Sequence, residues 1–308
     1  MTREKTRINL SLPNRFILSA QVNMSRPRSC NYCKNKIPPS VTVCPHCGRP
    51  SLFPNVEAAE ADDERAALEV RYQSAQAEGA ARGVDSILKD FESALANSSA
   101  VIARSVTETQ RLATSDHELY ATYYQLIGAG VKVPEGSKWD ILRVAADAAL
   151  FPNYKEQIRF AALSLDGAGL FNYGECLLVL KEEMIAHRAS VFEENSVTFM
   201  GHKLKGFLEL ADLPRGYRAT WAERGKLCVA KLHGSIDAST QPDKYSGMLL
   251  REGNNTEDDD FVEVHICGSM TARTLERVIV SPHLKRKQSA TIIKALKEKL
   301  SKLGVGIG

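Results

Sequence analysis

The sequence predicts an α+β fold in which a small cysteine-rich module precedes a larger domain of mixed strands and helices. Three observations predict this fold class. Two closely spaced Cys-x2-Cys pairs lie near the N-terminus. Residues 57–113 are rich in Ala, Glu, Gln and Arg, a composition that favours helix. After Gly169 the chain changes to short runs of Leu, Val and Ile, which are typical of buried strands.

The composition is that of an ordinary globular protein. Hydrophobic residues make up 44% of the 308 residues and charged residues 25%, which excludes a wholly disordered chain. Forty Lys and Arg nearly balance 37 Asp and Glu, and a net charge of +3 argues against nucleic-acid coating by bulk charge. No apolar run approaches the ~20 residues of a membrane helix. We therefore expect a cytoplasmic protein with no membrane partner, whose seven cysteines are not paired as disulfides.

Residues 1–27 are expected to be a flexible N-terminal extension, because residues 1–23 lack hydrophobic periodicity. Met24 is followed by Ser, Arg and Pro and resembles a start of its own, so residues 1–23 are either an extension or an over-long gene model. An intact mass that begins at Met1, with this segment protected from protease, would exclude both explanations.

The first module is defined by its cysteines. Cys30-x2-Cys33 and Cys44-x2-Cys47 are separated by ten residues, a pattern typical of a tetrahedral metal site. Two thiolates two residues apart can bind one ion from a single tight turn, and the second pair closes the site. Residues 28–50 resemble the zinc-ribbon family, and the resemblance implies a structural zinc ion held by all four thiolates.

A closed four-thiolate site has no open coordination position, so any function of the ribbon lies at its surface. The surrounding basic and aromatic residues would suit a nucleic-acid strand; they are Arg26, Arg28, Tyr32, Lys34, Lys36 and Arg49. A protein-docking or merely solubilising role is equally open. The three remaining cysteines lie in apolar segments and are expected to be inert core thiols; they are Cys176, Cys228 and Cys267.

Helices are expected next. Residues 57–113 should form a helical connector, with an apolar stripe at helical spacing that includes Val84, Leu88 and Phe91. Three shorter helices should follow, each opened by a capping residue with an acidic residue three positions later. Their expected first residues are Ser115, Ser137 and Asn153.

Short apolar runs between polar segments predict four strands, at 175–180, 227–232, 261–267 and 277–280. The acidic stretch 252–260 is poor in apolar residues, so we expect an exposed mobile loop there. Together these elements form the expected α+β domain, residues 115–283. A basic amphipathic helix is expected over 284–303, with lysines that are either simply solvated or contact phosphates or an acidic partner.

Residues 154–283 resemble the ADP-ribosyltransferase-like family in three stretches. Tyr173-Gly174-Glu175 and an apolar run lead into Arg188-Ala189-Ser190 and Asn195-Ser196, which is similar to a motif of bacterial members. A polar loop precedes the stretch from Phe261 to His265, as a target-recognition loop precedes the family's catalytic glutamate strand. A glycine, a short helical segment and a last strand follow.

The resemblance implies a transferase that uses NAD as its substrate. Glu263 would stabilise the oxocarbenium-like charge that develops when the nicotinamide–ribose bond breaks. Arg188 would hold the pyrophosphate and Tyr173 would stack on the nicotinamide. Ser190 or Ser196 would hydrogen-bond NAD or support the glutamate.

His265 follows Glu263 by two residues, so both side chains share one face of the expected strand. Many members carry a second Glu or Gln at the position that corresponds to His265, so the chemistry of the target stays open. Another branch of the family opens with His-Gly on its first strand. His233-Gly234 matches those letters, but it lies only 30 residues before Glu263, too near to be that motif.

The leading interpretation is an enzyme similar to bacterial toxins of toxin–antitoxin or phage-defence systems. It implies a macromolecular target, RNA or protein, and an antitoxin or chaperone as inhibitor. The alternative is a non-enzymatic zinc-ribbon adaptor that binds nucleic acid or protein. A metal-dependent nuclease is disfavoured, because the sequence lacks the clustered carboxylates and histidines of such enzymes. The target, the oligomeric state and the presence of an inhibitor do not follow from the sequence.

Overall fold

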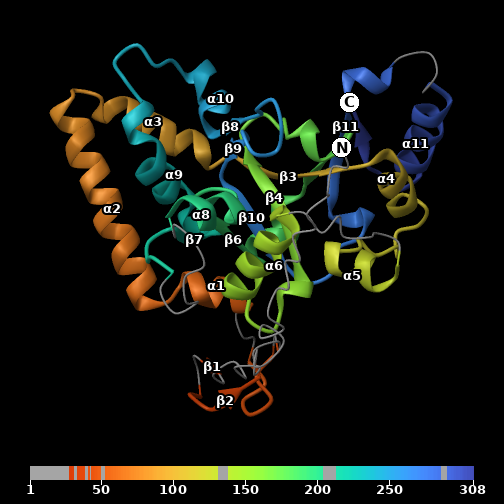
Figure 1. The fold of residues 1–308 in the computed structure, drawn as a ribbon, viewed down its shortest axis with the longest axis horizontal. Helices are drawn as coiled ribbons and strands as arrows, with labels where there is room; N and C mark the ends of the chain where they lie inside the picture. The colour runs from red at the N-terminus through yellow and green to blue at the C-terminus, as the bar shows by residue number, and fades with distance from the viewer. Residues whose placement is uncertain are drawn as a thin grey trace, which may run out of the picture.

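The computed structural model describes residues 28–30, 33–38, 41, 43–49, 53–130, 138–203, 213–285 and 290–308. Within these residues the protein is mixed α/β, built on an eight-stranded sheet with two additional two-stranded sheets (Figure 1). The expected extension, 1–27, lies outside the described residues. None of the helices described combines the length and the apolar character needed to cross a bilayer.

The large sheet has the strand order β12-β11-β5-β3-β4-β10-β6-β7. Its strands are β3 Ser99–Arg104, β4 Ile158–Ser164, β5 Cys176–Leu180, β6 Ala189–Phe192, β7 Arg218–Thr220, β10 Glu263–Cys267, β11 Leu275–Val280 and β12 Gly306–Ile307. The sheet is mixed, because β11 and β12 run parallel whereas the other neighbours are antiparallel. In this strand order β10 is an interior strand, between β4 and β6.

The two small sheets are short hairpins. β1 (Arg28–Ser29) pairs with β2 (Lys36–Ile37) in the cysteine-rich module. β8 (Leu250–Arg251) pairs with β9 (Asp260–Phe261), so most of the acidic stretch 252–260 forms the exposed turn of a hairpin that leads into β10.

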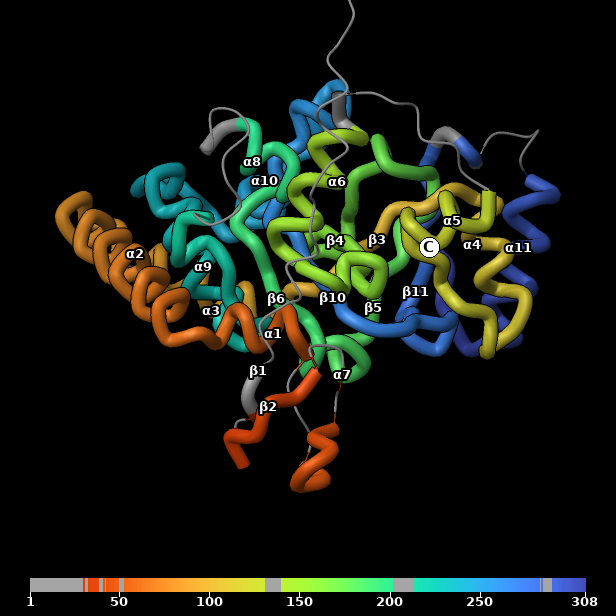
Figure 2. The backbone as a smooth tube through the Cα atoms, turned by 60° about the horizontal axis from the view of Figure 1, so that its bottom comes forward, coloured from red at the N-terminus to blue at the C-terminus, as the bar shows by residue number. Residues whose placement is uncertain are grey.

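Helices cover both ends of the sheet. They are α1 Pro54–Ala59, α2 Asp62–Ala81, α3 Asp85–Leu95, α4 Val106–Leu112, α5 Tyr123–Gly128, α6 Lys138–Leu150, α7 Glu182–Ile185, α8 Ser196–Lys203, α9 Arg224–Leu232, α10 Tyr245–Leu249 and α11 Ala290–Lys302. In Figure 1, α2, α3 and α9 gather at one end, and α4 and α11 at the other. Helices α6 and α8 contact each other, and α6 runs beside β4 and β10 (Figure 2).

Two apolar clusters hold these layers together. The larger joins the sheet to α2, α3 and α9 at one end and to α11 at the other. The smaller is aromatic and lies between the sheet and helices α6 and α8; it includes Phe151, Tyr154, Phe192 and Phe199. This smaller cluster packs against one face of β10.

Three of the four expected strands are confirmed, as β5, as β9 with β10, and as β11. The strand expected at 227–232 is wrong, because these residues belong to helix α9. Leu227, Cys228 and Val229 are all buried, since α9 is enclosed by α2, α3 and the sheet. A helix that is apolar on most sides has no visible period and resembles a buried strand in sequence.

Two expected helices are strands instead. Residues 99–104 of the expected connector form β3, at the middle of the sheet, so 57–113 is not helical throughout. The helix expected to open at Asn153 is replaced by β4. Its apolar residues Ile158, Phe160 and Leu163 fit a helical spacing, but β4 is covered on both faces and has apolar residues at most positions.

The expected capped helices after 115 are partly confirmed. The first helix begins at Tyr123 rather than near Ser115, because Thr122 and Gln125 form the capping box. The helix expected after Ser137 is α6, and the basic C-terminal helix is α11. Residues 286–289 of the latter expectation lie outside the described part of the chain.

At Gly216 the chain passes close to the backbone of α2. The φ of Gly216 is +84°, and a Cβ there would lie 2.7–2.9 Å from backbone atoms of Ala67 and Leu68. Gly216→Ala is therefore expected to lower the free energy of unfolding by about 2 kcal/mol or more, as measured by urea denaturation. Gly201→Ala is the control. A Cβ at Gly201, in α8, would have no atom of the described residues within 4 Å, so this substitution should be neutral or stabilising; equal losses in both variants would contradict this reading.

Candidate functional site

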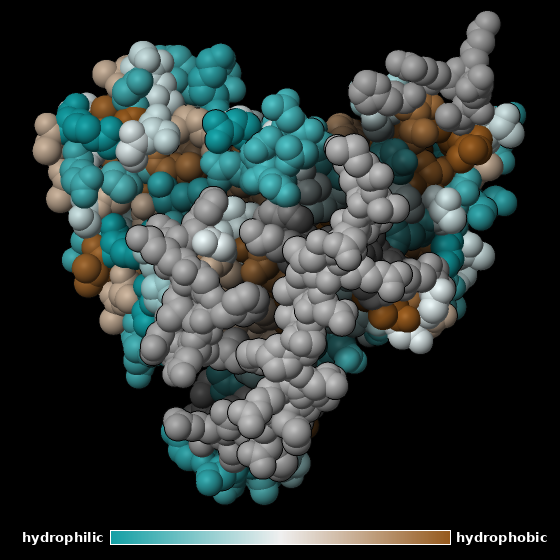
Figure 3. Space-filling model, in the orientation of Figure 1, coloured by the Kyte–Doolittle hydropathy of each residue, from teal (hydrophilic) through white to brown (hydrophobic). Residues whose placement is uncertain are grey.

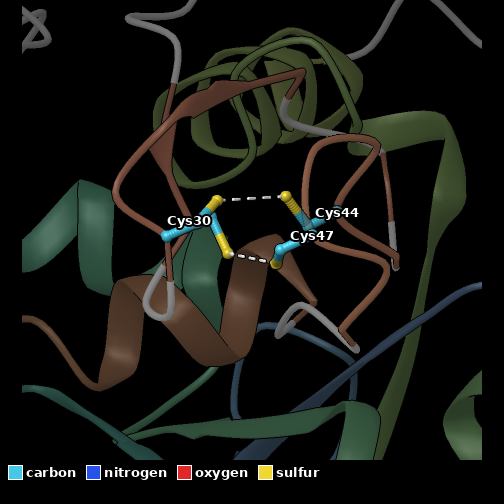
Figure 4. Close-up of side chains that lie close together, drawn as sticks. Cys30, Cys44 and Cys47 are labelled. Atoms are coloured by element: carbon cyan, nitrogen blue, oxygen red, sulfur yellow. Dashed lines mark hydrogen bonds between the residues drawn. The ribbon is translucent and has the colours of Figure 1, made fainter.

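The four cysteines of the first module form a compact group. All four sulfur atoms lie within 4.8 Å of one another, with Cys30 and Cys47 at 3.7 Å and Cys33 and Cys44 at 3.6 Å (Figure 4). Zn–S bonds of about 2.3 Å in a tetrahedron place sulfurs about 3.8 Å apart, whereas a disulfide requires about 2 Å. The donor set and its spacing therefore fit a zinc ion.

Two similar turns create this arrangement. The Cys30 carbonyl accepts the Lys34 N–H at 2.8 Å, and the Cys44 carbonyl accepts the Gly48 N–H at 2.9 Å. Lys34 and Gly48 both have positive φ, +59° and +67°. Each turn presents two thiols to the same point, and a bound zinc ion would supply the crosslink that joins the two turns.

A second group of polar side chains surrounds the start of β10. Glu263 and His265 point to the same face of the sheet and are 2% exposed each. His265 Nε2 lies 2.9 Å from Glu263 Oε2, and the His265 ring is enclosed by Phe151, Phe160 and Phe192. The structure thus brings together the two residues predicted to be catalytic.

Three groups contact the Glu263 carboxylate. Oε2 accepts the backbone N–H of Ser196, the first residue of α8, at 3.0 Å, in addition to its contact with His265. Oε1 lies 3.7 Å from Nη1 of Arg143. Burial would raise the pKa of Glu263, but His265, Arg143 and the side chain of Ser196 outweigh it and hold that pKa below its ordinary value. Glu263 is therefore an anion at neutral pH.

Arg143 connects this carboxylate to helices α6 and α8. Its Nη1 donates to Ser196 Oγ at 2.9 Å and to Asp147 Oδ1 at 3.4 Å. The other oxygen of Asp147 accepts the Tyr124 hydroxyl at 2.8 Å. Burial would lower the pKa of Arg143, but Glu263 and Asp147 raise it above its ordinary value. The guanidinium therefore stays charged beside Glu263.

Tyr173 lies at the outer edge of the same group. It belongs to a 3₁₀ turn, Phe171–Tyr173, and is 40% exposed. Its hydroxyl accepts a hydrogen bond from Nδ2 of Asn195 at 3.3 Å. Asn195 Oδ1 in turn accepts one from the Val197 N–H at 2.9 Å, near the start of α8. Burial, reinforced by the charges of Asp259 and Glu263, raises the pKa of Tyr173, so the phenol stays protonated.

Arg188 lies at the other end of β10, and Ser190, although it is the cross-strand partner of His265 on β6, contacts α1 rather than Glu263. The Arg188 guanidinium donates to the carbonyls of Met184, Cys267 and Ser269, at the opposite end of β10 from Glu263. The Ser190 hydroxyl lies 3.2 Å from Nδ2 of Asn55 in α1. The structure does not bring Arg188 together with Glu263, and the pyrophosphate contact expected of Arg188 stays a prediction that its bonds to carbonyls disfavour.

Three polar residues of the site carried no clear signal in the sequence. Arg143 and Asp147 come from a helix whose pattern indicated only packing, and their i,i+4 spacing was the one available sign. Asn195 belongs to the stretch that resembles the ADP-ribosyltransferase-like family, but the resemblance assigned it no function. The contacts of the His233 ring lie outside this group of polar side chains: they are with Glu78 of α2 and with the carbonyl of Ala230.

The ionised state of Glu263 makes a testable prediction. A lowered folded-state pKa stabilises the fold above the unfolded pKa of about 4.3, and this contribution is lost as pH falls through the folded value. Glu263→Gln should therefore cost about 1–3 kcal/mol at pH 7. The difference from wild type should shrink below about pH 4 in urea denaturation curves. A difference that is constant from pH 7 to pH 3 would contradict an anionic Glu263.

No protein-family model matches this chain, and no curated protein matches it in sequence. The geometry of the described residues gives two candidate sites: the four-cysteine group that could hold zinc, and the polar group around Glu263.

Proposed function

We propose that the protein cleaves the nicotinamide–ribose bond of NAD and transfers ADP-ribose to a macromolecule, with Glu263 as the central catalytic residue. One observation carries the proposal: at the start of an interior strand, Glu263 is a buried carboxylate whose pKa is held below its ordinary value and whose Oε1 forms an ion pair with Arg143. A buried carboxylate that stays charged stabilises a developing positive charge strongly, because little water screens it.

The chemistry follows from that charge. As the C1′–N bond of NAD breaks, nicotinamide leaves with the bonding electron pair and the ribose acquires oxocarbenium character. Glu263 Oε1 would face this charge, while His265 and the Ser196 N–H keep Oε2 in place. An acceptor hydroxyl or amine then forms the new bond to C1′ and releases a proton. Tyr173, half-exposed at the edge of the group, would contact the nicotinamide ring.

One role differs from the expectation. Arg143, which contacts Glu263, takes the place of Arg188 as the guanidinium nearest to the proposed site. The finer assignment, a toxin or defence effector controlled by an antitoxin or chaperone, stays a prediction.

The direct test is incubation of the purified protein with NAD that carries a label on the adenylate, together with cellular RNA or cell lysate. Release of nicotinamide with transfer of label to RNA or protein is the expected result. Neither release nor transfer in the presence of both acceptors would contradict the proposal.

A second candidate function is favoured by the ribbon surface. Lys34, Lys36 and Arg49 are exposed around the cysteine group, and three cations on one small module suit a phosphate backbone. Under this alternative the ribbon is a nucleic-acid-binding adaptor without enzymatic activity. Salt-sensitive RNA or DNA binding that is weakened by replacing these three residues with Gln, without NAD turnover, would favour it.

A further inference from the structure

Asp259 is a buried acidic residue in an otherwise exposed acidic segment. It is 5% exposed, whereas its neighbour Asp258 is exposed. Its Oδ1 accepts the backbone N–H of Gly253 at 2.8 Å and Nδ2 of Asn172 at 3.0 Å. The hydrophilic surface over β8 and β9 is visible in Figure 3. These bonds fix the orientation of the Asp259 carboxylate.

The second oxygen, Oδ2, is buried, and no described residue hydrogen-bonds to it. Asp259 also has no ion-pair partner among the described residues, whereas the next residue, Asp260, contacts Lys231 at 2.6 Å and Arg251 at 3.7 Å. A buried acceptor without a donor costs about 1–3 kcal/mol. Such groups are rare in native proteins and require an explanation, and a ligand that brings the missing donor is one.

Asp259 is placed to share a ligand with Glu263. Asp259 directly precedes β9, Phe261 ends β9 and Glu263 opens β10, so the three residues occupy alternate positions, which in extended chain face the same side. Phe261 clusters with Ala162, the register partner of Glu263, as expected for residues on one side. At about 3.3 Å per residue, four residues of extended chain separate the Cα atoms of the two acidic residues by at most about 13 Å.

The residues between the two carboxylates connect them. The Tyr173 ring lies 6.3 Å from that of Phe261. Asn172, next to Tyr173, holds Asp259, while the Tyr173 hydroxyl contacts Asn195, next to the Ser196 that holds Glu263. One short turn therefore borders both carboxylates.

We infer that Asp259 binds the hydroxyls of a second ribose, the one at the adenosine end of the dinucleotide, through its unpartnered Oδ2. This assignment rests on the proposed function. Carboxylates recognise ribose hydroxyls in dinucleotide sites. Two carboxylates on one side of a strand, several residues apart, suit a ligand whose two riboses are separated by a pyrophosphate better than they suit one sugar.

The test compares NAD with nicotinamide mononucleotide, which has the scissile bond but no second ribose. Asp259→Asn keeps the shape of the side chain and an oxygen that can accept the Gly253 N–H. It should raise KM for NAD by about tenfold to a hundredfold, the effect of losing a charged hydrogen-bond acceptor, with kcat little changed. KM for the mononucleotide should not change. Equal effects on both substrates, or none on NAD, would overturn the assignment.

Asp258→Asn is the matched control, because Asp258 is the exposed neighbour and its carboxylate contacts only Asn255 among the described residues. A binding measurement separates this inference from the proposed function. Calorimetric titration with ADP-ribose should show weaker binding to Asp259→Asn than to wild type or Asp258→Asn, whether or not NAD is cleaved. Asp259-dependent binding without cleavage would refute the proposed function alone, and cleavage with Asp259-independent binding would refute this assignment alone.

Discussion

Glu263→Gln is expected to lower the rate of nicotinamide release from NAD by about a hundredfold to a thousandfold while the protein remains folded. This is the typical cost of removing one preorganised group that stabilises transition-state charge. Gln has nearly the same shape, and its carbonyl can still accept the Ser196 N–H, but it carries no charge toward the ribose. The measurement is single-turnover release of nicotinamide at saturating NAD, so that kcat rather than KM reports the loss.

Glu276→Gln is the matched control for this substitution. Glu276 lies on β11 of the same sheet, but it is exposed and its carboxylate pairs with Arg277. Its substitution should leave the rate unchanged. Suppose that Glu263→Gln turns over NAD at the full rate but is less stable than wild type at pH 7. The buried charge would then support the fold and not catalysis.

Local sequence was sufficient where the chemistry is local. The four cysteines that could hold zinc lie in two Cys-x2-Cys turns, and each turn is set by residues within four positions of its first cysteine. Glu263 and His265 were also predicted as a pair, because the period of a strand places alternate residues on one face. Both placements depend on neighbours in the chain and follow from spacing, whereas the choice of Glu263 and His265 as catalytic residues rests on the resemblance to the ADP-ribosyltransferase-like family.

The remaining parts of the site depend on contacts distant in sequence. Arg143 reaches Glu263 only because α6 lies beside β10, and the periodicity of α6 contains no information about that position. The position of Arg188 also depends on a distant contact, because the β6–β10 register places it beside Cys267, at the other end of β10 from Glu263.

The errors in secondary structure share one physical cause. β3 and α9 are both buried by other elements, and burial on several sides removes the polar positions that would reveal a period of 2 or 3.6 residues. β3 adds a second reason, because its Ala-containing sequence has weak strand preference and is held by ladders to β4 and β5. Tertiary pairing, not local propensity, made it a strand.

Removal of zinc is expected to unfold the ribbon and leave the large domain folded. The ribbon's own core consists of Ile37 and the buried thiols Cys30 and Cys44, with Cys33 and Val41 partly buried against them. Burial of one Ile contributes about 2–3 kcal/mol, whereas structural zinc contributes about 10–16 kcal/mol in zinc-binding peptides. Hydrogen exchange of amides in the described part of 28–49 should therefore become unprotected after chelation, while β4, β5 and β10 stay protected.

Cys44→Ser and Cys228→Ala separate the metal role from the packing role of cysteine. Cys44→Ser removes one of four ligands, so bound zinc should fall from about one per chain and the ribbon amides should lose protection. Cys228→Ala should keep the zinc but lower the stability of the large domain by about 1 kcal/mol, because Cys228 is fully buried in the large cluster around α9. Ribbon amides that remain protected in zinc-free protein would contradict a metal-dependent fold. That result would mean that packing alone holds the four sulfurs together, although the small apolar cluster around them is not expected to stabilise a fold without a metal.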